Sequence, residues 1–200
     1  MTVKTRVEVT PTAANILAVW NRATAEQIAE GMEWYGVAHT LALELSPADV
    51  HRGAGILAAL SPNESWERNV ILARRTIAEH GLTGGTLGNS VTKANAILAG
   101  AEPLSVMGKG LKTRSFYVNI ADPLDDTTVT IDRHAYDVAL DLKNAENDRL
   151  SLTPKRYEAF SVAYRGAART LGILPSQVQA VTWVAWRSRV CSLVTPARTS

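Results

Sequence analysis

Apolar residues recur three and four positions apart along most of the chain, which is the spacing of one buried helix face. Residues that cap helix N-termini precede many of these runs. Thr24 with Gln27 also has the spacing of a capping box. We therefore expect about ten helices. Seven follow the caps Thr12, Thr24, Ser46, Ser90, Asp132, Thr153 and Ser176, and the others run from Trp66 to Gly81, from Pro103 to Met107 and from Leu111 to Ile120.

Where this helical spacing stops, the residue types predict loops or extended segments. Residues 61–63 (Ser-Pro-Asn) and the glycine-rich residues 81–90 predict loops. The β-branched residues 128–131 predict a short extended segment. Period-two alternation is scarce elsewhere, so the pattern predicts an all-α fold.

Composition narrows the class of protein. The chain has 200 residues, of which 46% are hydrophobic and 20% charged, which is typical of a folded domain. No apolar run approaches the roughly 18 residues that a membrane helix needs, and the N-terminus has no apolar signal core. Cys191 is the single cysteine, which excludes an internal disulfide and a cysteine-held iron–sulfur cluster. We expect a cytoplasmic monomer without a metal cofactor or a membrane partner.

Charge is distributed unevenly behind the net value of +2. Residues 151–200 carry seven Lys or Arg and one acidic residue, Glu158. A basic segment of this kind suits phosphate binding, and it is equally compatible with a solvated basic face.

The most informative stretch is VMGKGLKT, residues 106–113. Two glycines, Gly108 and Gly110, allow a tight turn between helices and leave the first N–H groups of the second helix free. These N–H groups and the helix dipole favour an anion such as a DNA phosphate. Alone, the pattern is also compatible with a plain helix–helix turn.

A second motif, IDRH at residues 131–134, follows after an extended run. Asp132 stands at a helix N-cap, where a carboxylate is often purely structural. The two motifs together resemble the helix-hairpin-helix (HhH-GPD, endonuclease III-like) DNA glycosylase superfamily, whose hairpin reads roughly LPGVGRKTA and whose later element reads VDTH.

Other segments extend the resemblance over about residues 54–189. Residues 56–69 are similar to the family's helix-plus-loop segment, which enters the duplex, and Lys93-Ala94 matches a KA pair ahead of the hairpin. The resemblance implies a two-lobed helical fold with the hairpin at about 106–112. One lobe would span 54–145, and the other would combine 1–53 with 146–200.

The resemblance also implies roles for individual residues. Lys112 matches the nucleophilic lysine of the bifunctional members, and Asp132 matches the catalytic aspartate. Double-stranded DNA would be contacted by Asn63, Gly108, Lys109, Gly110, Thr113 and Arg114. The only bound ion it implies is a monovalent cation at the hairpin.

Some residues depart from the family pattern. Lys109 replaces an apolar residue, Arg114 replaces an alanine, and Arg133 replaces the threonine of VDTH. Trp183, Trp186 and Arg187 are candidates for stacking on an extruded base. Tryptophans spaced by three on a helix are also typical of a core.

Three functions therefore stand side by side. The first is a DNA glycosylase and abasic-site lyase with Lys112 as nucleophile and Asp132 as catalytic carboxylate. The second is a transferase that modifies thymine bases on the same scaffold, as in glycosylase-like proteins of phages, which this chain resembles in its C-terminal part; a phage protein would act in the host cytoplasm. The third is a non-catalytic DNA-binding module that keeps the hairpin.

Overall fold

A computed structural model describes residues 10–142 and 150–194, with side chains described through residue 187. Every regular element in this part of the chain is a helix, which confirms the all-α prediction. The helices are α1 (Ala13–Trp20), α2 (Ala25–Leu45), α3 (Val50–Leu60), α4 (Trp66–Ala78), α5 (Gly88–Leu98), α6 (Pro103–Val106), α7 (Leu111–Ala121), α8 (Arg133–Leu140), α9 (Pro154–Leu171) and α10 (Pro175–Val194). None of the described helices has the length and apolar character needed to cross a bilayer.

Several caps lie where the sequence predicts them. The side chains of Thr12, Asp132 and Thr153 each accept a hydrogen bond from the backbone N–H three residues on. Thr24 and Gln27 form both halves of a capping box. These helices begin where local hydrogen bonding alone favours their start.

Three predicted caps are wrong. Ser46 ends α2, and Asp49 caps α3 by accepting from the N–H of Arg52. Ser90 is buried inside α5, which begins two residues earlier at Gly88. Ser176 is buried within α10, which begins at Pro175. A serine near the start of a helical pattern therefore does not by itself show where the helix begins. Asp49 caps α3, and no side-chain cap is seen for α5 among the described residues.

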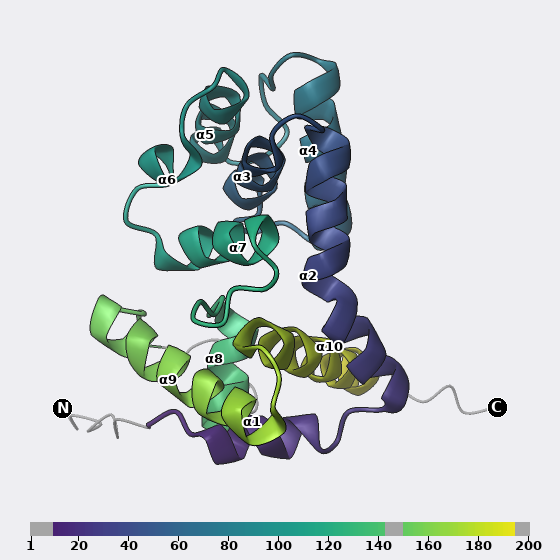
Figure 1. Ribbon diagram of the computed structural model, residues 1–200, viewed down its shortest axis with the longest axis vertical. Helices are drawn as coiled ribbons and strands as arrows, with labels where there is room; N and C mark the ends of the chain where they lie inside the picture. The colour runs from purple at the N-terminus through teal and green to yellow at the C-terminus, as the bar shows by residue number, and fades with distance from the viewer. Residues whose placement is uncertain (1–9, 143–149, 195–200) are drawn as a thin grey trace.

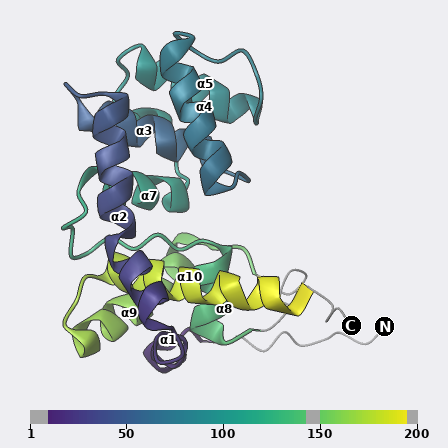
Figure 2. The same cartoon turned by 90° about the vertical axis from the view of Figure 1, so that its right-hand side faces the viewer.

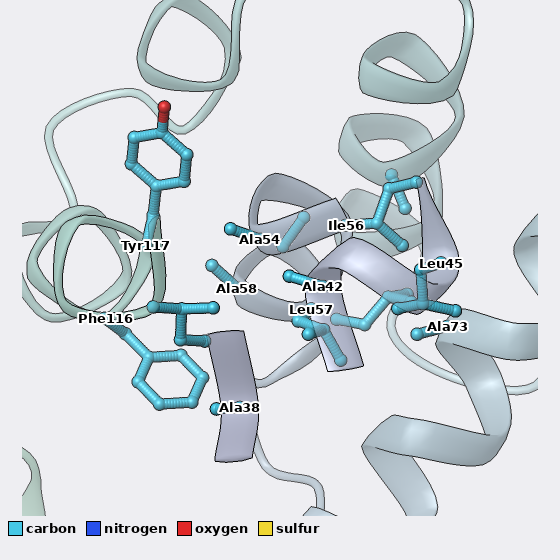
Figure 3. Packing of buried hydrophobic residues seen from close by; sticks show 14 of the residues in the cluster. Ala38, Ala42, Leu45, Ala54, Ile56, Leu57, Ala58, Ala73, Phe116 and Tyr117 are labelled. Carbon is cyan, nitrogen blue, oxygen red and sulfur yellow. The ribbon is translucent and has the colours of Figure 1, made fainter. Parts of the chain in front are cut away.

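The core has two parts. The hairpin-side cluster, defined by buried residues between α2 and α7 together with Ala180 of α10, lies in the upper part of the molecule in Figure 1. Its closely packed alanines and leucines are seen in Figure 3. The terminal-helix cluster, defined by buried residues of α1, residues 129–140, α9 and α10, lies below it.

These clusters divide the chain at other places than the lobes expected at 54–145 and at 1–53 with 146–200. The second half of α2, from Tyr35 to Leu45, packs in the hairpin-side cluster. Residues 129–140 pack in the terminal-helix cluster. The difference arises because α2 ends at Leu45, ahead of the predicted boundary at residues 53–54, and its second half already packs in the hairpin-side cluster.

The α2 helix reaches from one cluster to the other and crosses α10 closely (Figures 1 and 2). Gly31 makes this approach possible, since a Cβ at Gly31 would lie 2.4 Å from the Cα of Val181. Gly36, five residues along the same helix, has no other atom within 4 Å of the corresponding position. Only the first of these glycines is required by packing.

The two glycines therefore form a matched pair for mutation. We expect Gly31→Ala to lower the free energy of unfolding by about 1–3 kcal/mol, because the backbone of α10 must move away. We expect Gly36→Ala to raise it by roughly 0.5–1 kcal/mol, because alanine favours the helix. Chemical denaturation measures both, and equal effects of the two substitutions would contradict the close α2–α10 contact.

Candidate active site: a lysine and an aspartate in an aromatic pocket

A pocket of about 110 Å³ lies between the two clusters. This is several times the roughly 10–15 Å³ that a water molecule needs, so the pocket has room for a larger group. Its walls come from α2, the α3–α4 loop, α4, α7, the segment before α8 and α10. The lining residues are Trp34, Tyr35, Ser61, Glu64, Ser65, Trp66, Asn69, Lys112, Phe116, Thr130, Asp132, Gln179, Ala180 and Trp183.

Lys112 and Asp132 both line this pocket, although twenty positions separate them in the sequence. Lys112 is the second residue of α7, and Asp132 is the N-cap of α8. Both side chains are partly exposed. The pocket thus combines an amine and a carboxylate, one from each side of the boundary between the clusters.

Asp132 is held in place by its own helix. Its Oδ1 accepts a hydrogen bond from the N–H of Ala135 at 2.8 Å. Oδ2 accepts no hydrogen bond from the residues that the structure describes, so it remains available to an occupant of the pocket. One carboxylate therefore serves both as a helix cap and as a charged group of the site.

The segment that leads to Asp132 is fixed from both sides. The Tyr157 hydroxyl accepts from the N–H of Ile131 at 3.0 Å and donates to the carbonyl of Val129 at 2.9 Å. Thr130 donates to Oδ1 of Asn119 at 2.9 Å, and Nδ2 of Asn119 donates to the carbonyl of Thr128 at 3.1 Å. Side chains thus supply the hydrogen bonds that a neighbouring strand would give, and the buried backbone N–H and C=O groups they reach are paired.

Aromatic rings form much of the wall. Trp34 lies at the centre of the group, with ring centroids 4.9 Å from Trp66, 5.9 Å from Phe116 and 6.0 Å from Trp183. The guanidinium of Arg187 lies 4.3 Å from the Trp183 ring, in a cation–π arrangement. Flat apolar walls with polar groups between them suit a planar, partly polar ligand.

Two amides add neutral polar groups. The hydroxyl of buried Tyr35 donates to Oε1 of Gln179 at 2.8 Å. Nδ2 of Asn69 donates to the carbonyl of Leu57 at 3.0 Å. Burial raises the pKa of Tyr35, and the charge of Asp132 acts in the same direction, so the hydroxyl stays protonated.

The predicted hairpin lies on the surface as a turn at residues 107–110 between α6 and α7. Gly108 has a φ of 65°, which glycine adopts readily, whereas Gly110 has an ordinary φ of −71° as N-cap of α7. Lys109 is exposed, and Met107 takes the buried place beneath the turn. No side chain caps the first N–H groups of α7, so they remain available to a ligand.

Arg114 has a structural role at the turn, and its predicted contact with DNA stays a prediction. Its Nη1 donates to the carbonyls of Leu104 at 2.8 Å and Gly108 at 3.1 Å. The Arg114 side chain therefore joins α6 to the turn through hydrogen bonds. Thr113, in the first turn of α7, is partly exposed beside Arg114.

The remaining predicted residues separate into two groups. Asn63 is exposed in the α3–α4 loop with a φ of 63°, and the loop residues next to it line the pocket. Trp183 lines the pocket and Arg187 stacks on it. Trp186 packs in the terminal-helix cluster instead of the pocket wall, so of the two tryptophans only Trp183 is placed to meet a ligand.

Sequence reasoning missed most of the wall. Trp34, Tyr35 and Phe116 lie on helices whose periodic pattern marks them only as apolar, and Gln179 is a polar residue within another predicted helix. Nothing near them in the sequence indicates which face meets the pocket. Trp66 and Asn69 lie within a segment that the resemblance singled out, and only that association pointed to them.

The described residues contain no group of three His, Cys, Asp or Glu side chains close enough to hold a metal ion. The monovalent cation expected at the hairpin stays a prediction.

The fold and pocket define an all-helical protein that holds a lysine and a carboxylate between aromatic walls. Over residues 1–190 the chain matches the family described as a family of unknown function, DUF7178. It belongs to that family, since the match covers nearly its whole length. No curated protein and no solved structure matches the chain.

His134, two residues after Asp132, gives a pH-dependent stability. Burial lowers the pKa of His134 from 6.5. The charges of Arg133 and Arg187 lower it further, whereas the charges of Asp132 and Asp137 each raise it by less than burial lowers it. The unfolded chain therefore binds the proton more tightly, so stability should be full above about pH 6.5 and fall as the pH drops toward the lower folded-state pKa.

This dependence can be tested by denaturation at about pH 7.5 and about pH 5.5. His134→Gln should lose less stability between the two conditions than the unmodified protein. An identical loss in both proteins would show that His134 does not carry the effect.

Proposed function

We propose that this protein is a DNA glycosylase with lyase activity, which excises a damaged or modified base from duplex DNA. Lys112 acts as the nucleophile and Asp132 as the catalytic carboxylate. The proposal includes a fold of the two-lobed HhH-GPD type, in which the two hydrophobic clusters correspond to the lobes.

One observation carries the proposal. Two residues chosen from separate motifs, Lys112 and Asp132, line the same pocket, and aromatic rings form its walls. An extruded base is planar, and its sugar carbon C1′ needs both a nucleophile and a negative charge close by. The pocket supplies a flat apolar site together with these two groups.

The chemistry follows from the two side chains. As the unprotonated amine of Lys112 attacks C1′, a C–N bond forms and the glycosidic bond breaks, leaving its electron pair on the base, which takes a proton from water. Positive charge that develops on the sugar is stabilised by the carboxylate of Asp132. One proton then passes from the amine to the ring oxygen as the C1′–O4′ bond breaks, which opens the sugar and gives a protonated imine. Removal of a 2′ proton then expels the 3′ phosphate, and water releases the lysine.

The surface around the pocket suits DNA. The exposed turn at Gly108 and Lys109 offers free backbone N–H groups and a positive charge. Two exposed arginines lie close to the pocket residues in the sequence. Arg133 follows Asp132 at the start of α8, and Arg187 lies one turn after Trp183 on α10. Such positive groups attract the phosphate backbone without selecting a sequence.

Borohydride trapping tests the nucleophile. With duplexes containing uracil, 5-hydroxymethyluracil or 8-oxoguanine, reduction of the imine should give a permanent protein–DNA adduct. Lys112→Gln should abolish the adduct. Lys109→Gln is the matched control and should keep it, since that side chain is exposed outside the pocket wall.

Asp132→Asn completes the test, because asparagine can still cap α8 through its side-chain oxygen. Excision should fall by about 10²–10³ or more while the thermal unfolding temperature changes little. Absence of adduct and of abasic product across the panel, with a mass change on a nucleoside when a co-substrate is supplied, would favour the transferase. Binding without either product would favour the DNA-binding module.

DNA affinity should depend strongly on salt. Each neutralised phosphate contributes about −0.9 to the slope of log K against log[salt], so several contacts give a steep line. Lys109→Gln should reduce the slope by about 1 at similar stability. Fluorescence anisotropy with a labelled duplex at a series of salt concentrations measures this, and affinity that is independent of salt would argue against DNA as the partner.

A further inference from the structure

Asn69 lines the pocket with half of its amide unused. Nδ2 donates to the carbonyl of Leu57, which lies in the last turn of α3. The N–H of Ser61 donates to Ala58 instead, so Asn69 satisfies an acceptor that the helix itself leaves open. This bond fixes which end of the amide faces α3.

The other end of the Asn69 amide is an unmet acceptor. Oδ1 is buried and accepts no hydrogen bond from the described residues, and the whole residue is only 2% exposed. Nearly all buried acceptors in folded proteins have a donor, so an unpaired one calls for an explanation. Its position in a pocket wall points to a donor on the molecule that occupies the pocket.

Gln179 offers the complementary half of an amide. Its Oε1 is held by the Tyr35 hydroxyl, while Nε2 donates to none of the residues that the structure describes. The residue is 5% exposed and lines the same pocket. It therefore offers an N–H donor that is not used within the described protein.

Together with the proposed function, on which this inference rests, these contacts lead us to propose that Asn69 and Gln179 read the pairing edge of the extruded base. The Gln179 amide donates to an acceptor on that edge, and Asn69 Oδ1 accepts from an N–H beside it. The aromatic rings contact the faces of the base, and these contacts do not distinguish the donors and acceptors on its edge.

The chemistry recognised is an acceptor next to an N–H donor on a planar heterocycle. A uracil or thymine ring supplies it as a carbonyl beside the ring N3–H. A cytosine ring supplies it as the ring N3 beside the exocyclic amine. Small bases methylated at N1, where the sugar is attached in DNA, separate the two sources without requiring any excision.

The experiment is a ligand-observed NMR titration of the full chain with two pairs of compounds. The first pair is 1-methyluracil and 1,3-dimethyluracil, and the second is 1-methylcytosine and its N4,N4-dimethyl derivative. In each pair the second compound lacks the N–H donor. We expect the protein to bind the N–H form of one pair about tenfold or more tightly than the blocked form, as one hydrogen bond to a buried acceptor allows.

Variants assign this difference to the two amides. Asn69→Leu keeps the size of the side chain and removes the acceptor, so the preference for the N–H form should disappear. Gln179→Leu should weaken both members of the pair alike and keep the preference. Asn95→Ala is the control, because both ends of that amide are paired with Leu82 away from the pocket, and it should change neither result.

Equal binding of both members of each pair, no binding of any compound, or an unchanged preference in Asn69→Leu would overturn the inference. If Asn69→Leu does not fold, the unmodified protein and Gln179→Leu still decide it. A preference for the N–H form without excision of any base would remove the proposed reaction and leave the edge reading intact. Excision with no such preference would do the reverse.

Discussion

The close contact between α2 and α10 at Gly31 is the constraint on which the site depends. Because Gly31 has no side chain, the two helices approach closely there, and Trp34 and Tyr35 on α2 line the same pocket as Gln179 and Trp183 on α10. The same contact joins the two hydrophobic clusters, since α2 continues into one and α10 belongs mainly to the other. The contact between Gly31 and Val181 therefore contributes both to the stability of the fold and to the geometry of the pocket.

Two side chains in this molecule, Asp132 and Asn69, serve structure and site at once. Asp132 caps α8 with one oxygen and presents the other to the pocket, and Asn69 satisfies α3 with its nitrogen and leaves its oxygen unpaired. In both cases the structural bond removes rotational freedom from the side chain. A polar group that is already fixed loses little entropy when a ligand binds.

The sequence predicted those features that depend on neighbouring residues. The helical pattern and the caps Thr12, Thr24, Asp132 and Thr153 are local, and the structure confirms them. The two motifs also pointed to Lys112 and Asp132, which share a pocket. What could not be predicted depends on three-dimensional packing that the helical pattern does not contain: the start of α5, the bonds of Arg114 at the turn, and the choice between Trp183 and Trp186 as the residue facing the pocket.

The unbroken course of α2 has a mechanical consequence. From Ala25 to Leu45 the helix has no proline, and its glycines do not interrupt it (Figure 2). α2 thus links the hairpin-side cluster to α10 as one continuous helix. If α2 keeps this course when DNA binds, the proposed function requires that the distortion which brings a base into the pocket come chiefly from the DNA. Under the proposed function, selectivity would then favour duplexes that are already easy to deform.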